Sequence, residues 1–139
     1  MKRFLPVLLC SVLALALLPA CGPKQASVNV SAHMDALKGT DNDAKANALG
    51  EIAKAGPGAA AAVPQLIELL KDPDPLIRRL SAYALFEIGP PAAKPALPEL
   101  RKLLQDENRE VITQALNSIR KIDPTGPEAK MAVPNVSTE

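Results

Sequence analysis

Residues 63–72 read VPQLIELLKD, and residues 97–106 read LPELRKLLQD. The two stretches share their order of proline, leucine and charged positions, and Pro64 and Pro98 lie 34 residues apart. A constant offset of about 20–50 residues is typical of repeat architectures, in which each unit buries its apolar face against the next. The sequence therefore predicts a short stack of repeats, a class of protein that presents a surface to a partner and needs no active site.

The residues between these stretches predict a pair of helices. Over residues 77–88, apolar and small side chains recur at the i, i+3, i+4, i+7 spacing of one helical face. Asp74 is placed to cap this helix, Pro75 suits its first position, and Gly89 ends it. A second helix is expected over residues 94–105, and the two helices together form a hairpin.

The hairpin recurs in both directions along the chain. Residues 111–122 repeat the first helix at the offset of 34, and residues 48–52 match residues 84–88 at an offset of 36. We therefore expect two complete hairpins, a third first helix, and the beginning of a further second helix at residues 129–134. Residues 33–38 have the pattern of a leading half-repeat.

The first twenty residues have the composition of a secretory signal peptide, with a basic start and an apolar run over residues 4–18. The run is shorter than the roughly 20 residues of a transmembrane helix. The ending LPAC at residues 18–21 resembles the bacterial lipobox, although Pro19 is an unusual occupant of its middle position. The resemblance implies cleavage before Cys21 and lipidation of that residue. An ordinary secretory signal with a nearby cysteine is the alternative.

The cysteine count fits lipidation. The chain has two cysteines, of which Cys10 would leave with the signal peptide, so a disulfide framework is excluded. Several acyl chains on Cys21 would hold the protein durably on a membrane. Gly22 follows it, where many Gram-negative lipoproteins retained in the inner membrane carry Asp. The resemblance thus implies the periplasmic face of an outer membrane, or the cell surface in a single-membrane bacterium.

The remaining chain divides into a tether over residues 21–32, a folded domain over residues 33–134 and a disordered tail over residues 135–139. The chain has 16 Lys and Arg against 15 Asp and Glu, and removing the two basic residues of the signal peptide leaves 14 against 15. A near-zero net charge, 2% aromatic residues and no tryptophan argue against a nucleic-acid partner.

Three stretches of the central copy resemble a bacterial HEAT repeat: DPDPLIR at residues 72–78, AYALFEIG at residues 82–89 and ALPEL at residues 96–100. They are most similar to the short HEAT-like repeats of phycobilisome lyases, and the resemblance extends over residues 34–134. It implies an all-α fold, a short right-handed α-solenoid of antiparallel helix hairpins. The tetratricopeptide repeat has the same period, but its aromatic and glycine positions are not filled here.

HEAT repeats commonly carry an arginine in the first helix that pairs with an aspartate and forms a ladder between repeats. By resemblance, Arg78 is this arginine, and Asp74 lies in the inter-repeat turn before it. The offsets of 36 and 34 place Asn42 and Ile112 at the equivalent positions of the other repeats. We therefore expect a single rung. We also expect an uncapped last repeat that frays or packs on another molecule.

The resemblance places partner binding on the second helices, which line the concave side of HEAT solenoids. Six polar positions of these helices are the candidate partner-binding residues: Gln65, Glu68, Lys71, Glu99, Lys102 and Gln105. A merely solvated face is the alternative, and the mixed charges give no indication of the partner's sign.

No catalytic, metal or cofactor site is expected. His33 is the only histidine, whereas zinc sites need three or four protein ligands, and the His-Glu pairs of HEAT-like iron hydroxylases are absent. The aspartates of the turns are placed to cap helices, and no calcium-loop spacing appears. A packing role is expected for Tyr83 and Phe86, with an exposed contact as the alternative for Tyr83.

Together these features predict a lipid-anchored, non-catalytic HEAT-repeat protein of the bacterial envelope that acts as a protein-binding module. Two alternatives stay open. One is a structural envelope lipoprotein that self-associates through its last repeat. The other is a degenerate lyase-type accessory protein, against which the lack of a reactive thiol and of aromatic surface in the domain argues.

Overall fold

The computed structural model describes residues 29–131 of the chain. The predicted signal peptide, Cys21, most of the predicted tether and the predicted tail lie outside these residues. Six α-helices follow one another in the described part: α1 (Val30–Ala36), α2 (Asn42–Ala55), α3 (Val63–Leu69), α4 (Pro75–Ile88), α5 (Leu97–Lys102) and α6 (Arg109–Ile122). Four 3₁₀ segments accompany them: η1 (Gly56–Ala62), η2 (Lys94–Ala96), η3 (Leu103–Gln105) and η4 (Pro127–Lys130). The described residues form no strand.

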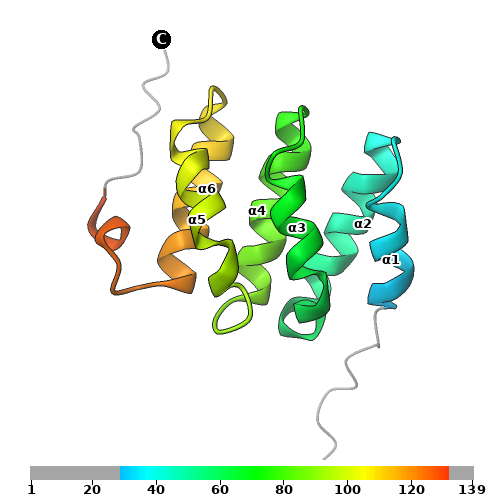
Figure 1. The fold of residues 1–139 in the computed structure, drawn as a ribbon, viewed down its shortest axis with the longest axis horizontal. Coiled ribbons are helices and arrows are strands. Elements are labelled where there is room, and N and C mark those ends of the chain that lie inside the picture. Colours follow the sequence, from blue (N-terminus) through cyan, green and yellow to red (C-terminus); the bar gives the residue numbers. More distant parts are fainter. Residues whose placement is uncertain (1–28, 132–139) are drawn as a thin grey trace, which may run out of the picture.

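The helices run alternately up and down and lie in two layers (Figure 1). The long helices α2, α4 and α6 form one layer, in which α4 packs between the other two. The short helices α1, α3 and α5 form the other layer and pack on α2, α4 and α6, respectively. This all-helical stack confirms the expected solenoid.

The pairing of the helices differs from the expected hairpins. The sequence paired the helix over residues 77–88 with the helix that follows it, whereas in the structure the short helix that packs on α4 is α3, which precedes it. The connection from Gly89 through η2 carries α5 one step along the stack, so that α5 lies over α6 (Figure 1).

The ends of α4 are those expected from the sequence. The Asp74 carboxylate accepts a hydrogen bond from the Leu76 backbone amide at 2.8 Å, and Pro75 occupies the first helical position. Gly89 ends the helix with a φ of 66°, a conformation that side chains with a Cβ adopt only with strain. Asp41 caps α2 in the same way, and Gly56 ends that helix with a φ of 53°.

These equivalent caps correct the predicted alignment of α2 with α4. Asp41 and Asp74 are 33 residues apart, and so are Gly56 and Gly89, so the helices correspond at 33 and not at the expected 36. The sequence match at 36 was displaced by about one helical turn, because apolar residues recur with nearly that period in any amphipathic helix. At the structural offset, Lys45 is the counterpart of Arg78.

The core lies between the two layers and is aliphatic. Leu66, Leu85, Leu100 and Ile119 are fully buried in one continuous cluster. Each such side chain contributes about 1.5–3 kcal/mol relative to an exposed one. Small residues such as Ala82 and Ala84 are also fully buried, which lets neighbouring helices approach closely.

A buried hydroxyl joins the two long helices that flank the C-terminal half of the core. The Ser118 Oγ of α6 lies 2.8 Å from the carbonyl oxygen of Ala82 in α4. Its distance to the Gln114 carbonyl oxygen of its own helix is also 2.8 Å. Because Ser118 is fully buried, this polar contact must be satisfied for α4 and α6 to pack.

Two cation–carboxylate pairs join successive repeats, so the expectation of a single rung was wrong. Arg78 donates from Nε to Asp106 Oδ2 at 2.8 Å and from Nη2 to Asp106 Oδ1 at 2.9 Å. Lys45 Nζ donates to Asp72 Oδ2 at 2.9 Å in the preceding repeat. The side chains of Asp72 and Asp106 are 6% and 7% exposed, so both pairs are largely withdrawn from water. We call these two pairs the ladder.

The ladder is joined to the turns that begin the long helices. Asp72 and Asp106 each accept a hydrogen bond from a backbone amide two residues further along, that of Asp74 and of Asn108, respectively. Arg78 also donates to the carbonyl oxygens of Asp72 and Pro73 at 2.8 and 2.9 Å. Each aspartate therefore both shapes its own turn and pairs with the preceding long helix.

The C-terminal end of the stack is partly covered, in contrast to the uncapped end that the sequence predicted. The segment η4 packs against α6. Its Glu128 is 8% exposed and accepts a hydrogen bond from Arg101 Nε of α5 at 2.7 Å. Asp123 lies 3.9 Å from Arg101 Nη2 and adds a second carboxylate to this cluster.

The first prediction concerns the ladder. The replacement Asp106→Asn leaves a largely buried arginine without its carboxylate, so we expect the free energy of unfolding to fall by about 1–3 kcal/mol, as for hydrogen bonds to charged groups. Urea unfolding monitored by circular dichroism measures the change. The control Glu107→Gln alters an exposed carboxylate of the same turn and should cost no more than about 0.5 kcal/mol.

The same pair of variants tests the electrostatic origin of the effect. The hydrogen bonds from Arg78 hold the pKa of the Asp106 carboxyl below its ordinary value. The stabilisation is therefore complete above the unfolded-state pKa of about 3.9 and is lost as the pH falls through the lower, folded-state pKa. The difference between the native protein and Asp106→Asn should shrink over that acidic range. A pH-independent difference, or an equal loss in Glu107→Gln, would contradict this account.

Candidate partner-binding groove

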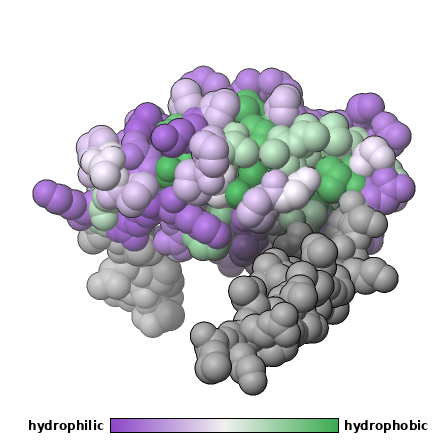
Figure 2. Space-filling model, turned by 90° about the horizontal axis from the view of Figure 1, so that it is seen from below, coloured by the Kyte–Doolittle hydropathy of each residue, from purple (hydrophilic) through white to green (hydrophobic). Residues whose placement is uncertain are grey.

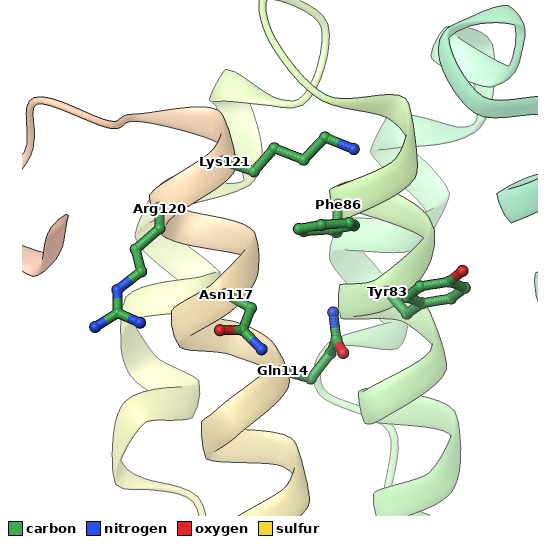
Figure 3. A pocket seen from close by; sticks show the side chains of 6 residues that line it. All are labelled: Tyr83, Phe86, Gln114, Asn117, Arg120 and Lys121. Atoms are coloured by element: carbon green, nitrogen blue, oxygen red, sulfur yellow. The ribbon is translucent and has the colours of Figure 1, made fainter. Parts of the chain in front are cut away.

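A groove runs between α4 and α6 on the outer face of the layer of long helices (Figure 3). Six side chains line its widest part, a hollow of about 520 Å³: Tyr83, Phe86, Gln114, Asn117, Arg120 and Lys121. The first two come from α4 and the other four from α6. The apolar stripe of α4, from Ile77 to Ile88, faces the core, so residues on the opposite side of the helix are left for this surface.

The aromatic side chains of α4 form one wall of the groove, and a cation of α6 reaches across to them (Figure 3). The rings of Tyr83 and Phe86 are stacked, with centroids 6.3 Å apart and planes 14° apart. Lys121 Nζ lies 4.0 Å from the Phe86 ring centroid, in the geometry of a cation–π contact, and 3.8 Å from Glu87 Oε2. Tyr83 is 41% exposed, so the packing role expected for it was wrong and the exposed contact is what the structure shows.

The groove continues toward the other ends of α4 and α6. A second hollow of about 540 Å³ shares Gln114 with the first and is lined also by Arg79, Arg109, Glu110 and Thr113. A smaller hollow of about 150 Å³ shares Arg79 and Glu110 with the second and includes Leu76, which is 42% exposed. The three hollows follow one another along the two helices, with the ion pair between Arg79 and Glu110 lining both the second and the third, and we call this row of hollows the channel.

The chemistry of this channel suits a peptide chain. Gln114 and Asn117 each carry an amide that can both donate and accept hydrogen bonds, as a peptide backbone requires. Tyr83 and Leu76 offer apolar surface at separate points along the channel. Aromatic residues and arginine are enriched at the centres of protein interfaces.

The six residues predicted to bind a partner lie on the other layer. Gln65, Glu68 and Lys71 belong to α3 and its end, and Glu99, Lys102 and Gln105 belong to α5 and η3. Glu68 and Lys71 approach to 3.6 Å, and Glu99 and Lys102 to 2.7 Å, so each helix neutralises its own charges.

Gln65 has a definite structural contact. Its Nε2 donates to the Met34 carbonyl oxygen at 3.0 Å and thereby joins α3 to α1. Its Oε1 is buried and has no hydrogen-bond partner among the described residues. Gln65 thus contributes to the packing of the first repeats, whereas Glu68, Lys71, Lys102 and Gln105 are exposed.

The groove residues of α6 were not identified from the sequence. A signal was present, because the offset of 34 maps Asn117, Arg120 and Lys121 onto Tyr83, Phe86 and Glu87 of the preceding repeat. The outward positions of successive long helices therefore pair aromatic with polar residues. Only the packing of α6 beside α4 shows that these positions enclose a groove.

The turns and the lone histidine provide no metal site among residues 29–131. Asp41 and Asp74 cap helices, and Asp72 and Asp106 belong to the ladder. In this part of the chain, no three His, Cys, Asp or Glu residues are grouped so as to hold a metal ion. None of the described helices is long and apolar enough to cross a membrane.

The two-layered stack and the open groove define a class, that of α-solenoid repeat proteins with a partner-binding surface. Within this class, the family model of HEAT repeats matches residues 30–99, half of the chain. The chain therefore belongs to the HEAT-repeat family. The match ends within α5, and α6 continues the same repeat at the offset of 34. No curated protein and no solved structure matches the chain.

Membership has a general functional consequence. HEAT repeats generally mediate protein–protein interaction, and the family is typically non-catalytic. The groove between α4 and α6 is consistent with that role, since it presents the exposed Tyr83 and Lys121 beside partly buried amides.

The second prediction uses the single tyrosine of the chain as a reporter of the groove. The Glu87 carboxylate beside the Tyr83 hydroxyl raises the pKa of that hydroxyl above its usual value of about 10. We expect the replacement Glu87→Gln to lower this pKa toward 10. Because there is no other tyrosine and no tryptophan, the ultraviolet absorbance of tyrosinate reports Tyr83 alone.

A matched control is Glu110→Gln, which removes a carboxylate from the far end of the channel. It should leave the pKa of Tyr83 unchanged. Identical titration curves for the native chain and Glu87→Gln would show that the Tyr83 ring does not lie where the structure places it.

Proposed function

We propose that this protein is a non-catalytic, lipid-anchored HEAT-repeat adaptor of the bacterial cell envelope, which binds a protein partner in the groove between α4 and α6. Membership of the HEAT-repeat family supports the binding role. The observation that carries the choice of surface is the exposure of Tyr83, which stacks on the partly buried Phe86 beside the amides of Gln114 and Asn117.

The groove is favoured over the polar face of the short helices for an energetic reason. The charged pairs on α3 and α5 are internal to each helix and exposed, and such pairs contribute about 0–1 kcal/mol. Aromatic residues that become buried on binding contribute more, and binding energy concentrates in a few such residues. An exposed tyrosine held by a neighbouring ring and carboxylate is already ordered, so less side-chain entropy is lost on binding.

The anchoring part of the proposal rests on the N-terminal sequence. Residues 1–21 combine a basic start, an apolar run and the lipobox-like ending LPAC, and Cys21 has no cysteine partner in the mature chain. A lipidated Cys21 followed by a short tether would keep the helical domain close to a membrane surface. Gly22 after the cysteine supports an outer-membrane destination in a Gram-negative cell.

The third prediction identifies the binding face by site-specific photo-cross-linking in the native envelope. The photoreactive residue benzoylphenylalanine is introduced in place of Asn117 in the groove, or in place of Lys102 on α5. We expect a protein adduct from position 117 and none from position 102. Adding Tyr83→Ala should abolish the adduct from position 117, because it removes the aromatic wall of the groove.

The outcomes separate the possible functions. An adduct from position 102 alone would move the binding surface to the short helices, as the sequence first indicated. An adduct with the mass of two copies of the chain would support the self-associating structural lipoprotein. Tyr83→Ala should leave the free energy of unfolding within about 0.5 kcal/mol, since Tyr83 is an exposed residue, so loss of the adduct could not be ascribed to unfolding.

The fourth prediction concerns the anchor. Replacing Cys21 by Ser removes the acceptor of the lipid, so the protein should move from the membrane fraction to the soluble fraction of the envelope. Cys10→Ser is the matched control, because that residue lies in the predicted signal peptide, and it should leave membrane retention unchanged. Unchanged membrane retention and unchanged gel mobility of Cys21→Ser would refute lipid anchoring.

A further inference from the structure

The two ends of the helical stack differ in the number of charged residues that they carry. The alternating direction of the helices places the connections α2–α3 and α4–α5 at the same end (Figure 1). These connections, residues 55–65 and 88–98, contain one charged residue, Lys94. We call this the loop end. Its third connection, residues 123–127, contains Asp123, which lies 3.9 Å from Arg101.

The opposite end is rich in charged residues, and we call it the turn end. Its three turns, residues 37–43, 70–76 and 104–110, contain seven Asp or Glu residues and three Lys or Arg residues. Three of the carboxylates, those of Asp72, Asp106 and Glu110, are paired with Lys45, Arg78 and Arg79 of the long helices. Part of this charge belongs to the helix starts, because Asp43 and Glu110 lie in the first turns of α2 and α6, where a carboxylate complements the helix dipole.

The loop end presents small and apolar residues to the outside. Its exposed residues are mostly proline, glycine and alanine: Pro57, Gly58, Ala60, Ala61, Pro64, Pro90, Pro91, Lys94, Pro95 and Pro98. Figure 2 looks onto this end and shows apolar residues gathered toward the α1 side, with polar residues toward the α6 side. Neither the packing of the core nor the groove explains why this face carries so few charged residues.

The chain reaches this same end from its N-terminal side. Helix α1 begins at Val30 at the loop end and runs toward the turn end (Figure 1). Eight peptide units separate Cys21 from Asn29, and a chain of that length spans at most about 28 Å. A long helix of 14 residues measures about 21 Å, so the turn end lies further from Cys21 by roughly that length.

From this geometry we propose that the loop end is a membrane-facing surface, which rests on the headgroups of the phospholipid bilayer that holds Cys21. The inference rests on the lipid anchor of the proposed function. The small uncharged residues of residues 55–65 and 88–98 can approach the bilayer without desolvating carboxylates, and Lys94 is attracted to anionic headgroups. The turn end carries many charged side chains, which would lose part of their hydration if they were pressed against the bilayer.

This orientation makes the helices stand on the membrane. The channel between α4 and α6 then runs away from the bilayer and opens to the side, where Tyr83 and Leu76 stay accessible to a partner. The ladder pairs, which belong to the turn end, lie away from the surface.

Fluorescence quenching by labelled lipids tests the orientation. The lipidated full chain is purified and placed in vesicles of phosphatidylethanolamine and phosphatidylglycerol that contain headgroup-labelled nitroxide lipid. Single cysteines with an attached fluorophore are introduced at the loop end, Ala60→Cys and Lys94→Cys, or at the turn end, Thr40→Cys and Glu107→Cys; all four positions are exposed. We expect the two loop-end probes to lose most of their fluorescence and the two turn-end probes to retain it.

A charge variant provides the matched control. Gly58→Glu with Ala61→Glu adds two carboxylates to the loop end, and a Cβ at Gly58 meets nothing within 4 Å, so the fold tolerates the change. In this variant the quenching of the Lys94→Cys probe should fall. Thr40→Glu at the turn end should leave it unchanged.

The failure of the orientation is distinguishable from the failure of the anchor. Native chain that does not float with vesicles and whose Cys21 reacts with a thiol reagent would refute lipidation. Coupling that free thiol to a maleimide lipid then restores an anchor at the same residue. The orientation of the domain can then still be measured by the quenching of the four probes. Equal quenching at all four positions, or stronger quenching at the turn end, in vesicle-bound protein would overturn the membrane-facing surface.

Discussion

No helix pair of this chain can bury its apolar face alone, and the rest of the structure follows from that constraint. Helix α4 has its aliphatic stripe covered only because α2 and α6 lie on either side and α3 lies over it. Fully buried alanines such as Ala82 and Ala84 permit the close approach, and Ser118 reaches the Ala82 carbonyl across the α4–α6 contact. Stability is therefore shared between neighbours along the stack, as in other repeat proteins.

Stacking of this kind also determines where function can lie. Helices that alternate in direction have their connections at the two ends of the stack. Three kinds of surface result: the outer face of the long helices, the outer face of the short helices, and the two ends. In this protein the three differ chemically. The layer of long helices has the aromatic groove, and the layer of short helices has self-neutralised charge pairs. One end has few charged residues, and the other has many.

The ladder shows how the sequence and the structure complement each other. Sequence matching placed Asn42 opposite Arg78, because similar apolar residues recur at nearly every helical turn. The structure instead aligns α2 and α4 by their caps, and Lys45 then occupies the position of Arg78 and pairs with Asp72. Caps are better guides than apolar residues here, since a capping aspartate and a terminal glycine mark the two ends of both α2 and α4.

The sequence by itself determined the local structure: the period of 34, the capping by Asp74, the end of α4 at Gly89 and the aliphatic residues of the core. These features depend on neighbours within a few residues, or on apolar spacing along one helix. Only the tertiary structure decided that α3 packs on α4, that Lys45 adds a rung, and that Tyr83 faces a groove completed by Asn117. Those features join residues of different helices, whose relative placement depends on how far each connection carries the chain along the stack.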